Sequence, residues 1–284
     1  MSAGAPTLSP PDRLSPAAAP SWSGSLRAIV HRGVRDRLRS TMIWGLALGT
    51  YGGFMAAVYP SIQGSLDQVL RNYPPALRQA FDVTSMGTVE GYIQAEMFSL
   101  IVPLVLCRFV IRAVTGPTVD AEARGHLDTI LSLPIARSAL MAGACLVAAL
   151  SAAAVMILTG AITFAVGRLA GTGISPGLVT AGVLGVLPLA LLAGGIAAVA
   201  AGALHSSGAA GGIALGAVIA MYGLDLAGRL APALAPLRWA SAFRYYGSPM
   251  LDGIHPVPFL GLTLVAVCLM VAGARLLERR DVRH

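Results

Sequence analysis

The chain contains six separate runs of apolar residues, each about as long as a helix needs to be to cross the roughly 30 Å of hydrocarbon in a bilayer. The runs cover residues 42–59, 97–114, 139–166, 178–204, 208–226 and 258–277. Only 12% of all residues are charged and 56% are hydrophobic, whereas soluble domains are about one quarter charged. We therefore predict an all-α membrane protein with six transmembrane helices.

The residues before the first run fall into two parts. Residues 1–24 are rich in Pro, Ser and Ala, without an apolar core behind a basic start, so they predict a disordered cytoplasmic tail and not a signal peptide. Residues 25–40, "SLRAIVHRGVRDRLRS", repeat apolar residues at helical spacing with Arg on the other faces. This pattern predicts an amphipathic elbow helix at the membrane surface.

The arginines predict the topology. Thirteen of them lie at residues 27–39, 108–137 or 275–283, and six lie in the other segments between runs. Because cytoplasmic loops carry the excess of basic residues, both termini and the loop 115–138 are predicted to be cytoplasmic. The outer segments 60–92 and 229–257 mix apolar, aromatic and Arg residues, which predicts short helices at the outer interface.

The same composition excludes several chemistries. Every one of the twenty basic residues is Arg, so the chain lacks the Lys that a P-loop needs to reach nucleotide phosphates. The arginines sit beside the ends of apolar runs, where they fit lipid contacts and topology and not nucleic-acid binding. Cys107, Cys145 and Cys268 stand alone inside apolar runs, without metal-site spacing. We expect no metal site and no cofactor on this chain.

An enzyme is not expected either. "GISPG" around Ser175 matches G-x-S-x-G, but that motif works on a strained strand-to-helix turn with His and acid partners, and here it joins two predicted membrane helices. Ionisable groups at membrane depth are usually functional. Glu96 and the pair Asp225 and Arg229 are predicted at the outer ends of their helices, and no carboxylate is predicted at the midplane, which disfavours an ion-coupled transporter.

Glycine and proline mark places where the helices pack or bend. Small residues four apart allow close helix contact, within one chain or between two. Candidates for such packing are Gly49, Gly53, Gly208, Gly212 and Gly216. Pro103 and Pro188 lie inside apolar runs, where each removes a backbone donor and predicts a kink.

The charged loop between the second and third runs, "DAEARGHLDTILSLPIAR", resembles the cytoplasmic loop of ABC-2 type permeases, the membrane subunits of a class of ABC exporters. That loop has an acidic cluster, Gly, a Leu-acid pair, a short apolar run, Pro and Arg. Three further segments resemble family segments in the same order: "TVEGYIQAEMFSLIVPL", "SAFRYYGSPMLDG" and "LLERRDV". Arg108 and His126 depart from the usual pattern.

The resemblance implies a permease domain over 25–284 in the bacterial plasma membrane. It also implies two copies of a separate ATPase subunit that carry ATP and Mg, a second permease copy that forms a homodimer, and a coupling helix in the loop. The expected ATPase-coupling residues are Asp120, Glu122, Arg124, Gly125, Leu127, Asp128, Leu131, Pro134 and Arg137.

The implied activity is outward transport, or efflux, of an apolar or amphipathic substrate, as in multidrug export. The pathway would follow the first, second and fifth spans at the seam between the copies, with Arg244, Tyr245 and Tyr246 as a candidate outer gate. An ion-coupled secondary transporter and a non-transporting membrane scaffold stay open as alternatives.

Overall fold

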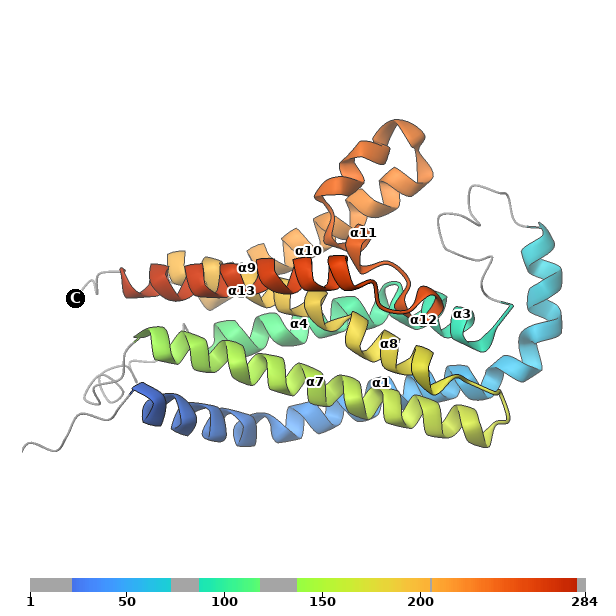
Figure 1. Ribbon diagram of the computed structural model, residues 1–284, viewed down its shortest axis with the longest axis horizontal. Helices are drawn as coiled ribbons and strands as arrows, with labels where there is room; N and C mark the ends of the chain where they lie inside the picture. The colour runs from blue at the N-terminus through green and yellow to red at the C-terminus, as the bar shows by residue number, and fades with distance from the viewer. Residues whose placement is uncertain (1–21, 73–86, 118–136, 205, 280–284) are drawn as a thin grey trace, which may run out of the picture.

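The computed structural model describes residues 22–72, 87–117, 137–204 and 206–279, and every regular element in these ranges is a helix. By length and composition, five helices could cross a membrane, or six if one bent pair counts as a single span. The helices lie side by side in an elongated bundle, and α13 (Pro256–Glu278) ends at the end of the bundle where α1 (Trp22–Asn72) begins (Figure 1). We call this the terminal end, and the opposite end, which carries α3 and α12, the distal end.

Helix α1 joins two elements that the sequence predicts separately. It runs through residues 25–40 and the first apolar run without a break, and continues past Pro60 into the predicted outer segment. No proline interrupts the sequence between Trp22 and Tyr59. The amphipathic segment is therefore the first part of a long helix, and a separate elbow helix is not confirmed.

Glycines on α1 let it pack closely along α7 (Arg137–Leu169). A Cβ atom on Gly49 would lie 2.7 Å from Cδ1 of Ile162, and one on Gly53 would lie 3.0 Å from Cγ2 of Val166. Such distances leave no room for a side chain. Two of the glycines predicted to pack helices therefore lie at a contact within the chain.

The second and fourth spans are each interrupted. In the second span, α3 (Val89–Ile93) leads through a π-helical turn, η2 (Gln94–Phe98), into α4 (Ile101–Thr115), with a bend of 43°. In the fourth span, α8 (Pro176–Gly185) ends just before α9 (Leu187–Ala203) begins. Pro103 and Pro188 each lie in the first turn after the break, where the missing N–H costs no helical hydrogen bond.

The last span packs against α9 with backbone touching backbone. A Cβ on Gly202 would lie 2.6 Å from the carbonyl oxygen of Gly273, and a Cβ on Gly273 would lie 2.5 Å from the carbonyl carbon of Ala198. Gly195 approaches the Ala266 carbonyl in the same way. These contacts hold α9 and α13 together by the close approach that small residues permit.

The chain between α10 (Ser207–Leu230) and α13 folds into three short helices: η4 (Pro232–Ala240), a 3-10 helix, then α11 (Ala242–Tyr246) and α12 (Pro249–Asp252). The end of α10 and η4 project sideways from the bundle (Figure 1). The outer segment 229–257 thus contains short helices, as predicted. Its place at the outer membrane surface stays a prediction.

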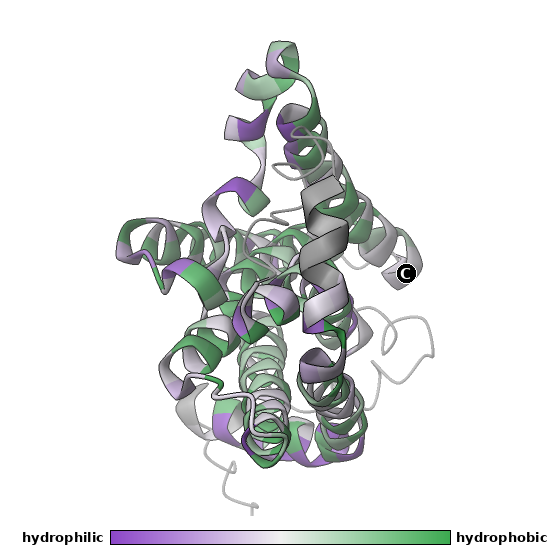
Figure 2. Ribbon diagram, turned by 90° about the vertical axis from the view of Figure 1, so that its right-hand side faces the viewer, coloured by the Kyte–Doolittle hydropathy of each residue, from purple (hydrophilic) through white to green (hydrophobic). Residues whose placement is uncertain are grey.

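Large apolar side chains cover much of the outside of the bundle. Figure 2, which looks along the bundle, shows mostly apolar colouring on the helices. On α1, α10 and α13, exposed examples are Phe54 (58%), Ile213 (55%) and Leu264 (65%). Apolar surface of this extent is unusual on a soluble monomer and fits contact with lipid or with another membrane protein.

Candidate functional site

The break in the second span leaves a backbone carbonyl that cannot be satisfied in the regular way. The N–H of Ser99 donates to the Gln94 carbonyl at 2.8 Å, a π-type bond, and Leu100 has a non-helical backbone with φ −139°. If this π-type pattern continued, the Phe98 carbonyl would accept a hydrogen bond from the N–H of residue 103. Residue 103 is a proline and has no N–H to donate. Backbone polar groups at membrane depth need a partner inside the protein.

Tyr246 supplies that partner. Its hydroxyl donates to the Phe98 carbonyl oxygen at 3.0 Å, and the backbone N–H of Met250 donates to Oε1 of Gln94 at 3.2 Å. Tyr246 and Gln94 are both buried. Burial raises the pKa of the Tyr246 hydroxyl well above its ordinary value, so it stays a donor. We call these two hydrogen bonds the latch, because they join the segment before the last span to the broken second span.

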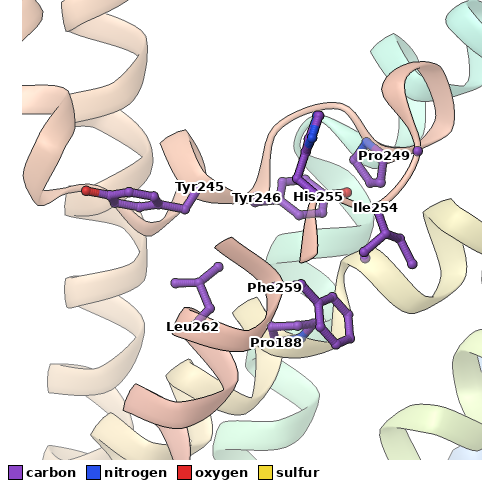
Figure 3. Close-up of a pocket in the computed structure, with 10 residues that line it drawn as sticks. Pro188, Tyr245, Tyr246, Pro249, Ile254, His255, Phe259 and Leu262 are labelled. Carbon is purple, nitrogen blue, oxygen red and sulfur yellow. The ribbon is translucent and has the colours of Figure 1, made fainter. Parts of the chain in front are cut away.

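Arg244 and Tyr245 face away from the latch. The guanidinium of Arg244 lies 4.0 Å from the centre of the Trp239 ring, and the Tyr245 hydroxyl donates to the Trp239 carbonyl oxygen at 3.1 Å. Figure 3 shows the Tyr245 and Tyr246 rings pointing to different sides. The structure therefore brings two of the three predicted gate residues together at η4 and places the third, Tyr246, inside the bundle.

An ion triad holds η4 against the end of α10. The buried Asp225 carboxylate accepts from Nε of Arg229 and from Nε of Arg238, both at 2.8 Å. The stem of Arg238 crosses Gly228, where a Cβ would meet it. The sequence predicts the Asp225–Arg229 pair from its spacing of four, and the structure contains it. Arg238 lies in η4, 13 residues after Asp225, so helical spacing does not predict this second ion pair.

A small recess opens beside the latch, where the chain between α11 and α13 faces the start of α9. Its empty volume is about 280 Å³, including its open mouth. Its lining combines apolar side chains such as Phe259 and Leu262 with polar groups from Tyr245, Tyr246 and His255 (Figure 3). Because Tyr246 belongs to both features, releasing the latch would change the shape of the recess.

The glycines of α10 differ from those of α1. No atom lies within 4 Å of a Cβ built on Gly212 or Gly216, and at Gly208 the nearest is the hydroxyl of the neighbouring Ser206, at 3.7 Å. All three glycines are exposed. Within the described part of the chain, this small-residue face of α10 is uncovered.

The residues predicted to couple the chain to an ATPase, from Asp120 to Pro134, lie outside the described residues. Arg137 is the first residue of α7. The last turn of α4 and the first turn of α7 both lie at the terminal end of the bundle (Figure 1). There the guanidinium of Arg37 on α1 donates to the Arg112 carbonyl near the end of α4, at 3.3 Å.

The described residues hold no group of three or more His, Cys, Asp and Glu side chains that could bind a metal ion. Five or six apolar helices, broken spans whose backbone groups are satisfied internally, and a largely apolar exterior define a polytopic α-helical membrane protein.

Comparison with family models gives the particular family. Residues 33–277 match the model described as multidrug efflux system permease Rv1217c, C-terminal domain. The chain belongs to this family, whose description fits a transporter membrane subunit. A comparison with curated protein sequences found no match.

Proposed function

We propose that the chain is the membrane subunit of an ABC-2 type exporter in the bacterial plasma membrane, moving an apolar or amphipathic substrate outward. The observation that carries the proposal is the match to an efflux permease family over residues 33–277, on a bundle with up to six membrane-spanning segments. The absence of Lys from the whole sequence supports a separate ATPase as the energy source, since this chain has no P-loop lysine.

The loop 115–138 is the proposed contact with that ATPase. Support comes from where the loop is anchored: α4 ends at Thr115 and α7 begins at Arg137, both at the terminal end of the bundle. The arginines predict this end to be cytoplasmic. Force applied to the loop would act on α4 and α7 directly, and on α1 through the Arg37 contact. Acids in the loop, such as Glu122 and Asp128, would pair with basic groups of the ATPase.

A second copy of the chain completes the proposed transporter. The uncovered face with Gly208, Gly212 and Gly216 on α10 supports an approach of two helices there. The pathway would then run between the copies, along the first, second and fifth spans. The latch lies at the distal end of the second span, so it is the proposed gate contact, with Arg244 and Tyr245 outside it.

Charge reversal in the loop tests the proposal. The proposed ATPase partner would be copurified with wild type, with Glu122→Arg and Asp128→Arg together, and with Asp36→Arg as a control at an exposed carboxylate on α1. We expect the double variant to lose copurification and substrate-stimulated ATP hydrolysis, and the control to keep both. Intact copurification and ATP hydrolysis in the double variant would refute the coupling role.

Transport assays separate the alternatives. Inside-out vesicles that contain the complex should accumulate substrate with ATP and stop when the ATPase carries an inactivating P-loop substitution. An ion-coupled transporter would continue with the inactive ATPase as long as an ion gradient is present. A non-transporting scaffold would show no substrate-dependent ATP turnover.

A further inference from the structure

Two tyrosines, a methionine and a carboxylate meet where α1 faces α3 and η2. The Tyr92 hydroxyl contacts Sδ of Met55 at 3.4 Å, and the Tyr92 ring lies 5.7 Å from the Tyr59 ring, centre to centre. Tyr51 lies one turn before Met55 on α1, and Glu96 lies one turn after Tyr92. Because α1 and the second span run in opposite directions (Figure 1), these turns lie opposite each other. We call Tyr51, Met55, Tyr92 and Glu96 the Glu96 cluster.

The carboxylate of Glu96 is exposed but sits among aromatic groups. It lies within electrostatic range of both Tyr51 and Tyr92. Tyr51 and Met55 are half-buried, and Tyr92 is buried at 9% exposure. In the part of the chain that the structure describes, the Glu96 carboxylate has no hydrogen bond and no ion pair.

The position of this carboxylate makes it unusual. Glu96 lies inside the segment that would form the second span, opposite Tyr51 of the apolar run 42–59 on α1. Ionisable groups within membrane-spanning segments are costly and commonly functional. Glu96 also lies in the π-helical turn η2, and such turns within α-helical segments are frequent at functional sites.

The chemistry of the cluster selects one class of ligand. A carboxylate attracts a cation, tyrosine ring faces attract a diffuse positive charge, and a thioether adds a polarizable apolar contact. An inorganic divalent cation would need several oxygen ligands, and the described residues offer no such group here. An anion would be repelled by Glu96.

We propose that the Glu96 cluster binds organic cations that carry a bulky apolar body, with the positive charge at the Glu96 carboxylate and the body against Tyr51, Met55 and Tyr92. This inference rests on the proposed function, because it names the substrate class of the same permease. The site is reached from the side of the bundle, where Glu96 is exposed. Glu96 lies between the latch residues Gln94 and Phe98 in η2, so a ligand bound at the site would contact the same broken helix as the latch.

Binding of a matched pair of ions tests the site without the ATPase. The full chain in lipid nanodiscs would be dialysed against tetraphenylphosphonium and, separately, tetraphenylborate, which have nearly the same shape and opposite charge. Empty nanodiscs give the lipid background. We expect specific binding of tetraphenylphosphonium alone, weakened at least tenfold by Glu96→Gln and unchanged by Glu278→Gln, an exposed acid at the terminal end.

A second pair of variants tests the aromatic part. Tyr51→Phe keeps the ring and should bind within about twofold of wild type, whereas Tyr51→Leu should bind roughly threefold to thirtyfold more weakly. Size-exclusion profiles confirm that each variant is folded. Three results would each overturn the inference: no cation binding above empty discs, equal binding by Glu96→Gln, or equally tight binding of tetraphenylborate. ATP-driven transport in vesicles is measured independently, so either idea can fail without the other.

Discussion

The hydroxyl of Tyr246 donates a 3.0 Å hydrogen bond to the carbonyl of Phe98, which lies 148 residues earlier in the chain. The bond satisfies a carbonyl at the break between η2 and α4, where Pro103, in the first turn of α4, has no N–H to donate. It also ties the segment before the last span to the second span. The break in the second span is therefore bridged at the distal end by Tyr246, a residue far away in the sequence.

Removing the Tyr246 hydroxyl should destabilise the fold. Tyr246→Phe keeps the ring in place but leaves the buried Phe98 carbonyl without this donor, which should cost about 1 to 3 kcal/mol. Thermal unfolding of the purified chain in detergent measures the change. Tyr245→Phe is the matched control, because Tyr245 is exposed and its bond to Trp239 can be replaced by water. Equal melting temperatures for the two variants would contradict this role of the latch.

Loss of the Asp225 charge should loosen η4. Asp225→Asn leaves the guanidinium groups of Arg229 and Arg238 close together without their shared carboxylate, so η4 should separate from α10 more often. Hydrogen exchange is the measurement, and amides of residues 232–240 should exchange faster while those of α9 stay protected. Asp36→Asn, at an exposed carboxylate that is 3.9 Å from Arg32, should leave the exchange of η4 unchanged. Unaltered exchange in Asp225→Asn would mean that the triad does not hold η4.

Valine substitutions at Gly49 and Gly212 should affect different properties: the stability of the chain and the association of two chains, respectively. Gly49→Val would collide with Ile162 and should destabilise the chain by about 1 to 3 kcal/mol. Gly212→Val meets open space within the chain, so unfolding should change little, whereas a pair of chains packed through α10 should dissociate. Unfolding and mass photometry in nanodiscs separate the two effects. A dimer that persists in Gly212→Val would exclude this face as the contact between copies.

Cysteine labelling should place the two ends of the bundle on opposite sides of the membrane. In a chain freed of Cys107, Cys145 and Cys268, single cysteines in 120–136 should react only from the cytoplasm, and those in 65–84 only from outside. An impermeant maleimide applied to intact cells and to inside-out vesicles makes the distinction. Labelling of both segments from the same side would contradict the six-span topology.

The sequence predicts the helical runs well because each must be about 20 apolar residues long to cross the bilayer. It does not predict where a run breaks. Pro103 and Pro188 indicate irregular spans, yet the breaks fall before them, at residues 99–100 and 186, because proline fits the first turn of a new helix.

The contacts of the latch and of the predicted gate residues could not be predicted from the sequence either, because they depend on tertiary packing. Arg244, Tyr245 and Tyr246 are neighbours in sequence, and only the short helix α11 turns Tyr246 inward and its neighbours toward η4. Gln94, an amide among apolar residues, was the available signal for the latch, but its partner Met250 lies 156 residues away. Helical spacing finds contacts such as Asp225 with Arg229 and cannot find those made by tertiary packing.

The glycine contacts between α9 and α13 have a mechanical consequence. With Gly202 and Gly273 each against the backbone of the other helix, neither helix can slide or roll past its neighbour without a steric clash. Helices α9 and α13 therefore move as one rigid body. A change of shape that opens a route through the membrane has to be absorbed by the remaining helices, with the interrupted second span as the natural hinge.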